Sequence, residues 1–292
     1  MFKFIFYKIG QFFVNLLSIK GAYHFVMFVS DLQYRFSPRD RLAVKNNLKI
    51  ITQSDDNIDF LARDVFRNMG KYLIEFFRMA NEIDEEFVRD RVKIVNKESI
   101  DKALARKKGI IIATAHIGNW ELGAVLISML GYPTNAIALP HKERPVNELF
   151  NKQRESKGVK VIAIKRSLRA SLRALQNNEC VGVVADRDFT STGFEMDFLG
   201  KNTLIPKGTA VLSAKTGAAI IPTFLLRDKE DSFRLVFDDP IYPPRIVEGS
   251  LDDDELLKDI IQKYISSIEK MIRKYPSQWM MFRQFWISSS SC

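Results

Sequence analysis

The sequence predicts an α/β fold in which helices flank a central, mostly parallel β-sheet. From about residue 92 onward, short runs rich in β-branched residues alternate with amphipathic segments. No repeat, low-complexity tract or long linker interrupts this alternation. Such alternation favours parallel strands connected by helices that cover the sheet. The ligands of such a sheet gather beyond the carboxyl ends of its strands.

The composition is that of a folded chain with an excess of basic residues. Of 292 residues, 46% are hydrophobic and 27% are charged, which argues against disorder. The 44 Lys and Arg residues exceed the 35 acidic residues, so the net charge is +9. This excess favours an anionic partner: nucleic acid, an acidic membrane surface or a phosphorylated substrate. The basic residues are spread throughout the chain without an arginine-rich aromatic platform, so nucleic acid is not the partner we expect.

Residues 1–35 are predicted to be a membrane-interacting helical segment that precedes one catalytic domain at residues 36–292. Residues 9–30 carry one full charge, Lys20, and no convincing signal-peptide cleavage site follows them. At helical spacing, a polar stripe opposes an apolar face: Lys8, Gln11, Asn15 and Ser18 against Phe12, Phe13, Leu16 and Leu17. This pattern favours a helix that lies in the membrane interface. The alternatives are a spanning helix, which needs about 20 apolar residues, and an ordinary core helix.

Helices and strands are then expected in a regular order. Residues 58–80 form a helix with one buried face, because their apolar residues recur every three or four positions. Further helices are expected at 120–131, 145–157, 167–177, 206–216 and 251–275, and Pro206 suits the first turn of its helix. The expected strands are Val92–Val95, Ile110–Ala113, Asn135–Leu139, Val159–Ile164, Val181–Ala185, Ala219–Leu225 and Arg234–Phe237.

Two cysteines, Cys180 and Cys292, make no disulfide framework, which favours a reducing, cytoplasmic setting. Cys180 lies in an apolar run and is expected to be a buried strand residue. The chain has three histidines and neither a His-Glu-x-x-His motif nor paired cysteines, so we expect no catalytic metal. It also lacks a Gly-x-Ser-x-Gly motif and a P-loop. His24 and His141 are expected to be structural or surface residues.

The densest candidate for chemistry is the turn after the strand that ends near Thr114. Asn119 suits the N-cap of the next helix, so His116 lies in the turn and Glu121 in the first helical turn. From there the His116 ring can fold back to the Glu121 carboxylate. That carboxylate would hold one ring nitrogen as N–H and leave the other free to take a proton from a hydroxyl. The helix N-terminus would favour neutral imidazole and supply donors for an oxyanion. The alternative is a structural histidine beside a capping glutamate.

Three more groups are candidates for binding on physical grounds. In the helix 145–157, Asn147, Asn151 and Arg154 share a polar face. Asp186-Arg187-Asp188 directly follows a buried strand, where a site residue is expected. Lys207 opens a helix whose N-terminus favours an anion. A solvated surface, a structural ion pair and a plain capped helix are the respective alternatives.

Four blocks in fixed order carry a resemblance to a known family. The segment His116–Glu121 resembles the His-x₄-Asp/Glu signature of glycerolipid acyltransferases. The other blocks are Arg144-Pro145-Val146-Asn147 with Arg154 and Gly158, Asp186-Arg187-Asp188 through Thr216-Gly217-Ala218, and Pro276-Ser277-Gln278-Trp279 with Arg283 and Phe285. Together they span residues 109–286 and resemble the late acyltransferases of lipid A biosynthesis and their relative, phosphatidylinositol mannoside acyltransferase.

The resemblance implies a glycerolipid acyltransferase-like fold with His116 as general base and Glu121 as its partner. The donor would be a thioester on acyl carrier protein or coenzyme A. The acceptor would be a hydroxyl of an anionic lipid A precursor at the cytoplasmic face of the inner membrane. The hydroxyl would attack the thioester directly, without a covalent enzyme intermediate or a cofactor. The substrate-binding residues that it implies are Asn119, Arg144, Asn147, Arg154, Asp186, Arg187, Asp188 and Lys207.

The acceptor is the least determined part of this expectation. Arg187 stands where many lipid A enzymes carry Gln, and this form is closer to the mannoside branch. Another glycolipid or a lysophospholipid is therefore the alternative acceptor. A non-catalytic, basic membrane-binding protein is the alternative of another class, and it would leave His116 and Glu121 without a role.

Overall fold

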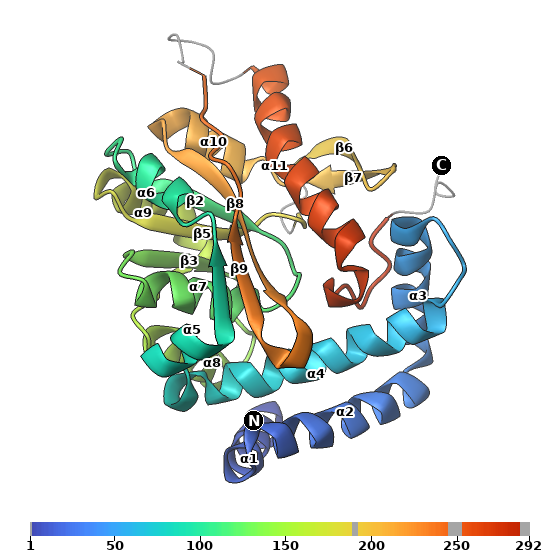
Figure 1. Cartoon of the computed structure of the whole chain (residues 1–292). Coiled ribbons are helices and arrows are strands. Elements are labelled where there is room, and N and C mark those ends of the chain that lie inside the picture. The colour runs from blue at the N-terminus through green and yellow to red at the C-terminus, as the bar shows by residue number, and fades with distance from the viewer. Residues whose placement is uncertain (1, 189–191, 245–252, 287–292) are drawn as a thin grey trace.

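The computed structural model describes residues 2–188, 192–244 and 253–286 (Figure 1). The chain opens with four helices: α1 (Phe2–Leu16), α2 (Ile19–Phe36), α3 (Pro38–Thr52) and α4 (Ile58–Glu82). The long helix α4 runs past one end of the sheet, and α1 and α2 lie on its outer side (Figure 1). Helix α2 packs mainly on α4, whereas α1 also contacts α8 (Arg144–Glu155) through Tyr7 and Phe150.

Seven strands form one mixed sheet in the order β1-β9-β8-β2-β5-β3-β4. They are β1 (Val92–Val95), β2 (Ile110–Thr114), β3 (Thr134–Ala138), β4 (Lys160–Ala163), β5 (Cys180–Val184), β8 (Ala219–Arg227) and β9 (Phe233–Phe237). All neighbours pair in parallel except β8 and β9, which are antiparallel. The sheet is therefore mostly parallel, as the sequence predicts.

Helices cover both faces of the sheet because its central strands are apolar on both sides. Along β2, Ile110 and Ile112 face one cluster and Ile111 and Ala113 face the other. The first cluster is completed mainly by α6 (Glu98–Leu104), α7 (Trp120–Met129) and α8 (Arg144–Glu155), with α5 (Glu85–Arg91) at its margin. The second is completed by α9 (Ser167–Gln176), α10 (Gly208–Thr216) and α11 (Asp254–Lys274). Short 3₁₀ turns occur at η1 (Ile164–Arg166), η2 (Lys229–Asp231) and η4 (Pro276–Gln278).

The seven strands and six helices expected from periodicity are present, with ends displaced by a few residues. The expected start of one helix, at Pro206, was wrong. Pro206 does not open a helix, because α10 begins at Gly208 and its N-cap is Lys207. Residues 251–252 of the expected last helix lie outside the described residues, and α11 begins at Asp254.

The separate hairpin of β6 (Phe194–Phe198) and β7 (Lys201–Ile205) was not expected from the sequence. Its two-residue turn places Leu199 and Gly200 at φ values of 60° and 90°. Such turns usually carry Asn or Asp at the first position, so leucine hides the signal. Tertiary contacts hold Leu199 instead: its side chain is buried and its N–H donates to Glu269 of α11.

The apolar N-terminal run is broken into two helices. Helix α1 ends at Leu16, and Ser18 caps α2 by accepting a hydrogen bond from the N–H of Gly21 at 3.2 Å. In the part of the chain that the structure describes, no helix combines the length and apolarity needed to cross a membrane. The outward faces of α1 and α2 nevertheless expose a set of large apolar side chains, here called the N-terminal apolar surface: Ile5, Ile9, Phe12, Phe13, Leu16, Leu17, Phe25, Phe28, Val29, Leu32 and Phe36.

Candidate active site

The carboxyl ends of β2 and β5 bring His116 and Asp186 together. These two strands pair in parallel, with Thr114 opposite Val184. The N–H of Ala185 donates to the carbonyl of Thr114 at 2.8 Å, which extends the pairing by one residue. His116 and Asp186 each lie two residues beyond the paired strand ends. Their meeting therefore follows from the register of two strands that are far apart in the sequence.

Asp186 is completely buried, and its carboxylate accepts three hydrogen bonds. Its Oδ1 lies 2.8 Å from Nδ1 of His116. Its Oδ2 accepts from the backbone N–H of His116 at 3.0 Å and from the indole N–H of Trp279 at 2.9 Å. Both the position of the His116 backbone and the direction of its ring are thus set by one carboxylate.

This pairing controls the protonation of both groups. Burial lowers the pKa of His116, but the negative charge of Asp186 and its hydrogen bond raise it more, so the pKa lies above its ordinary value. Burial raises the pKa of Asp186, but the His116 charge and the three hydrogen bonds lower it more, so its pKa lies below the ordinary value. Asp186 is therefore an ionised partner that keeps the Nδ1 of His116 protonated.

The C-terminal segment closes the turn from the other side. The carbonyl of His116 accepts from the N–H of Met280 at 2.8 Å, and Ile117 and Trp279 form an antiparallel bridge. The carbonyl of Gln278 accepts from the N–H of Gly118 at 3.0 Å. The Pro276–Trp279 block, to which the sequence assigns no role, therefore holds the turn that carries His116 in place.

Gly118 is required where the turn meets β8. Its φ is +61°, and a Cβ at this position would lie 1.9 Å from the carbonyl oxygen of Leu225. The same oxygen accepts from the N–H of Asn119 at 2.9 Å. Because the N–H groups of Gly118 and Asn119 both donate within the protein, neither is available as the oxyanion donor expected at this helix start.

Glu121 does not contact the His116 ring through a hydrogen bond in the structure. Instead its carboxylate forms a two-pronged ion pair with Arg154 of α8, at 2.7 Å to Nε and 2.6 Å to Nη2. The sequence analysis expected Glu121 behind His116, whereas Asp186 occupies that place. The physical reason is that Glu121, in the first turn of α7, points toward Arg154 of α8. Asp186 instead follows β5, which pairs with β2, the strand that leads to His116. The charge of Glu121 still contributes to raising the pKa of His116.

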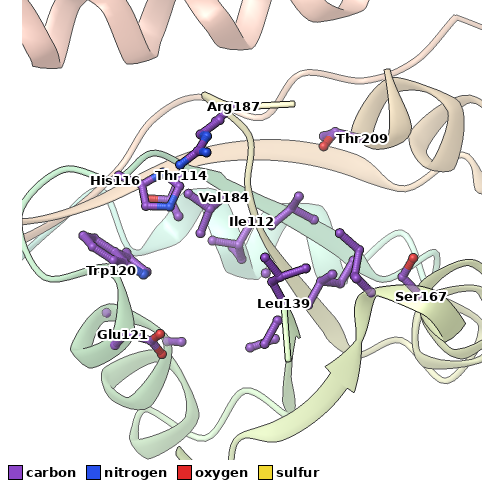
Figure 2. Close-up of a pocket in the computed structure, with 18 of the residues that line it drawn as sticks. Ile112, Thr114, His116, Trp120, Glu121, Leu139, Ser167, Val184, Arg187 and Thr209 are labelled. Atoms are coloured by element: carbon purple, nitrogen blue, oxygen red, sulfur yellow. The ribbon is translucent and has the colours of Figure 1, made fainter. Parts of the chain in front are cut away.

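A cavity of about 710 Å³ opens beside His116 (Figure 2). This volume is within the range of about 300–1,000 Å³ that is usual for small-molecule sites. Figure 2 shows His116 and Arg187 at one side of the cavity and Ser167 and Thr209 at the other. The His116 side chain is 22% exposed, so its ring is accessible from the cavity while its partner is not. The apolar lining includes Met69, Leu73, Ile112, Ala124, Ile127, Ala136, Leu139, Val184 and Leu225.

The structure places five of the predicted site residues on this cavity besides His116. Glu121 and Arg154 line it as an ion pair, and Arg187, Asp188 and Lys207 line it beyond the ends of the strands. Arg187 extends toward His116 in Figure 2. The Asp188 carboxylate accepts from the backbone N–H groups of Thr192 and Gly193 at 3.1 and 2.9 Å. These contacts give Asp188 a role in holding its own loop.

The remaining predicted binding residues lie elsewhere in the described structure. Asn119 is buried, caps α7 by accepting from the N–H of Leu122 at 3.0 Å, and donates to Glu75. Arg144 is exposed and pairs with Glu148. Asn147 accepts from the backbone N–H of His141 at 3.1 Å. His141 itself lines the cavity and packs against Phe150, with ring centroids 4.3 Å apart.

Three residues at or near the site make contacts that sequence reasoning missed. Asp186 was expected to bind substrate, although its place directly after a buried strand was a signal that it belongs to the site. Trp279 was assigned only to the C-terminal block of the resemblance, and its indole N–H gave no local sign of its partner. Glu75 lies in the middle of an amphipathic helix, where a glutamate usually faces solvent, but it is 4% exposed.

Other chemistry-bearing side chains behave as structural groups. Cys180 is buried in β5, and burial raises the pKa of its thiol to about 12. Cys292 lies outside the described residues. His24 is exposed, with its Nδ1 2.8 Å from the carbonyl of Lys20. Among the residues with described positions, no group of three or more His, Cys, Asp or Glu side chains is arranged to hold a metal ion.

Comparison with known proteins identifies the family of this chain. A family model described as bacterial lipid A biosynthesis acyltransferase matches residues 1–288. Phosphatidylinositol mannoside acyltransferase of Mycobacterium tuberculosis is 27% identical over 228 residues, which cover 76% of this chain and 69% of the relative. Lipid A biosynthesis palmitoleoyltransferase of Escherichia coli is 25% identical over 245 residues, which cover 83% of this chain and 76% of the relative. The chain is thus an acyltransferase that belongs to the bacterial lipid A biosynthesis acyltransferase family.

Proposed function

We propose that this enzyme transfers a fatty acyl chain from an acyl thioester to a hydroxyl of a lipid A precursor, with His116 as the general base. The observation that carries the proposal is the His116–Asp186 pair at the side of a largely apolar cavity. The buried carboxylate orients the base, and the cavity suits a fatty acyl chain.

The mechanism follows from which ring nitrogen is engaged. Because Nδ1 of His116 donates to Asp186, Nε2 is left to accept the proton of the acceptor hydroxyl. The hydroxyl oxygen then attacks the thioester carbonyl, and a tetrahedral oxyanion forms. As the carbon–sulfur bond breaks, the thiolate leaves and takes the proton back from His116. Asp186 stays ionised throughout and stabilises the transient imidazolium.

The cationic groups on the cavity support anionic substrates. Arg187 extends toward His116 and is the group that we assign to the thioester oxyanion or to an adjacent phosphate. Lys207 lines the same cavity beside the N-terminus of α10. Arg154 is held by Glu121, so the role of this pair is to shape the cavity wall between α7 and α8. This assignment makes Glu121 a positioning residue and Asp186 the partner of the base.

A second acceptor class has a specific observation in its favour. The relatives include phosphatidylinositol mannoside acyltransferases that are 25–27% identical to this chain, beside lipid A enzymes at 23–25%. The resemblance of the third block points the same way, because Arg187 is closer to its mannoside form. A mannose-bearing phospholipid is therefore the alternative acceptor, and both candidates are anionic glycolipids that suit a chain of net charge +9.

We place the enzyme at a membrane surface, on the cytoplasmic face of the inner membrane. The support is the N-terminal apolar surface, in which Phe12, Phe13 and Phe36 are 63%, 58% and 73% exposed. Large exposed apolar patches mark membrane or protein contacts. A membrane contact fits best because the acceptor is a lipid, and because Lys8, Lys20 and Arg35 are also carried by α1 and α2.

The test is transfer of a labelled acyl chain in purified enzyme. Wild type, His116→Ala and the control His24→Ala are each assayed with acyl carrier protein and coenzyme A thioesters. The acceptors are tetraacylated lipid A precursor, phosphatidylinositol mannoside and lysophospholipid. We expect transfer to lipid A precursor that falls about 10²–10⁴-fold in His116→Ala and is unchanged in His24→Ala. Transfer to the mannoside alone would establish the alternative acceptor, and transfer that survives His116→Ala would contradict the mechanism.

A further inference from the structure

Glu75 is a buried carboxylate outside the cavity that joins three parts of the fold. It lies on α4 and is 4% exposed. Its Oε1 accepts from Tyr23 of α2 at 2.7 Å and from Arg227 at the end of β8 at 2.5 Å. Its Oε2 accepts from the side-chain amide of Asn119 at 2.7 Å. Neither the His-x₄-Glu motif nor the transfer mechanism uses this group.

The bond to Asn119 reaches the catalytic turn directly. Asn119 lies three residues after His116 and is the N-cap of α7, on which Trp120 and Glu121 line the cavity. Its amide donates to Glu75 while its Oδ1 accepts from Leu122, so the side chain is held at both ends. The orientation of this one amide therefore links Glu75 to the start of α7 and to the turn that carries His116.

Charge compensation alone does not explain the arrangement. A buried carboxylate needs a cation and hydrogen bonds to offset its desolvation. Arg227 supplies the cation, and it also contacts Asp231 at 3.4 Å. The hydrogen bonds from Asn119 and Tyr23 also connect Glu75 to two other parts of the fold, the turn that carries His116 and helix α2. On its outward face, the same helix carries Phe25, Phe28 and Phe36 of the N-terminal apolar surface.

We infer that Glu75 is a positioning residue for acyl transfer, which fixes the His116 turn through Asn119 and connects it to the N-terminal helices through Tyr23. The inference rests on the proposed function, since it concerns the rate of that reaction. It extends the functional site to residues that do not touch the cavity. It also makes α2 part of the catalytic unit as well as part of the expected membrane contact.

The most direct test exchanges donor and acceptor in the hydrogen bond between Asn119 and Glu75. In Glu75→Gln, the amide oxygen can still accept from Arg227 and Tyr23, but the new NH₂ group then faces the NH₂ group of Asn119. Adding Asn119→Asp gives that NH₂ group an acceptor, keeps a carboxylate oxygen for the N–H of Leu122, and restores the net charge. We expect Glu75→Gln to lower kcat about 10–100-fold, with KM changed less than about twofold. The double variant should recover most of that loss.

Tyr23→Phe tests the connection to α2 and has a matched control. Tyr34, also on α2, donates to a carboxylate of α4 at the same distance of 2.7 Å, but that carboxylate is the exposed Asp59. We expect Tyr23→Phe to lower kcat about 3–10-fold, in line with one lost buried hydrogen bond, and Tyr34→Phe to behave as wild type. Equal effects of the two variants would overturn the connection.

A spectroscopic measurement keeps this inference separable from the proposed function. The chain has only three histidines, so ¹⁵N-histidine NMR resolves the His116 ring. We expect its signals to shift or broaden in Glu75→Gln and to return in the double variant, whether or not an acceptor has been found. A wild type inactive with every donor and acceptor would count against the proposed function alone. Unchanged His116 signals, or a double variant no better than Glu75→Gln, would overturn the positioning role.

Discussion

At the scale of single residues, two carboxylates compete for the role of partner to His116. Asp186 is completely buried and bonds directly to Nδ1, whereas Glu121 is engaged by two guanidinium nitrogens of Arg154. A carboxylate whose two oxygens already accept hydrogen bonds from one guanidinium group is a weaker acceptor for a second donor. The local motif therefore indicates His116 as the candidate base but does not identify the group that orients its ring.

The pH dependence of the reaction distinguishes the two carboxylates. Transfer requires neutral His116, so kcat should fall as pH drops through the His116 pKa, which Asp186 holds above about 6.5. In Asp186→Asn this support is lost, so the acidic limb should move to lower pH and the plateau rate should fall at least about 10²-fold. In Glu121→Gln the limb should move less, because Glu121 acts on His116 through charge alone. The measurement is kcat between pH 5 and 9.

The opposite order would contradict this assignment. If Glu121→Gln moves the acidic limb further than Asp186→Asn, then Glu121 is the effective partner of the base. Near-ultraviolet circular dichroism of both variants serves as the control, because Asp186→Asn removes a buried charge and Glu121→Gln a half-buried one. The fold must stay intact for the profiles to be compared.

Gly118 provides a residue-scale test of the turn geometry. A Cβ would lie 1.9 Å from the carbonyl oxygen of Leu225, and the residue has φ +61°. Gly118→Ala should therefore lower the free energy of unfolding by more than about 2 kcal/mol and abolish transfer. Gly131→Ala is the matched control: its φ is +92°, but no atom lies within 4 Å of the added Cβ. That variant should lose only about 1 kcal/mol and remain active. Chemical denaturation and the transfer assay check both, and a stable, active Gly118→Ala would show that the turn adjusts.

At the scale of elements, the site depends on the order and register of strands. Periodicity along the chain locates β2 and β5, because strands buried on both faces are continuous apolar runs. It does not reveal that β5 lies beside β2, since β3 and β4 intervene in the sequence. The residues that follow the strands could thus be predicted as site residues, but not their pairing across the sheet.

The N-terminal helices make an element-scale prediction about membrane binding. Phe12 and Phe13 are more than half exposed on α1, so Phe12→Ser/Phe13→Ser should weaken binding to vesicles that contain anionic lipid. We expect a loss of about 10-fold or more, because each exposed phenyl ring contributes on the order of 1–2 kcal/mol when it leaves water. Vesicle sedimentation measures the effect.

The control for this experiment is Tyr242→Ser, which removes an exposed aromatic side chain, 42% exposed, from a segment outside the N-terminal helices. It should bind vesicles as wild type does. Equal binding by the Phe12→Ser/Phe13→Ser variant and wild type would mean that the N-terminal apolar surface faces another partner.

At the scale of the whole molecule, the cavity lies where several helices and the strand ends converge. Its walls come from α4, α7 and α8 on one face of the sheet and from α9 and α10 on the other. The spacing of apolar residues along a helix indicates which face of that helix is apolar. The volume left between several such faces is set only when all of them are packed together.

The volume of this cavity predicts control of acyl-chain length. Ala124 of α7 lines it, so Ala124→Phe should fill part of the space and shift the preferred donor to a shorter acyl chain. The measurement is competition between donor thioesters of different chain length, with the total rate recorded separately. The control Ala105→Phe lies at an exposed position outside the lining and should keep the wild-type preference. An unchanged preference in Ala124→Phe would mean that the acyl chain lies elsewhere.

The sequence by itself determined the α/β architecture, the main strands and helices, His116 at a strand end and the family resemblance. These features are local, because they depend on residue spacing, capping and motif order within short stretches of chain. Only the tertiary structure decided that Asp186 and Trp279 meet at His116, that Arg154 engages Glu121, and that Glu75 holds Asn119. The physical reason is that each of these contacts joins segments more than 30 residues apart. Strand order and helix packing, rather than local pattern, bring such segments together.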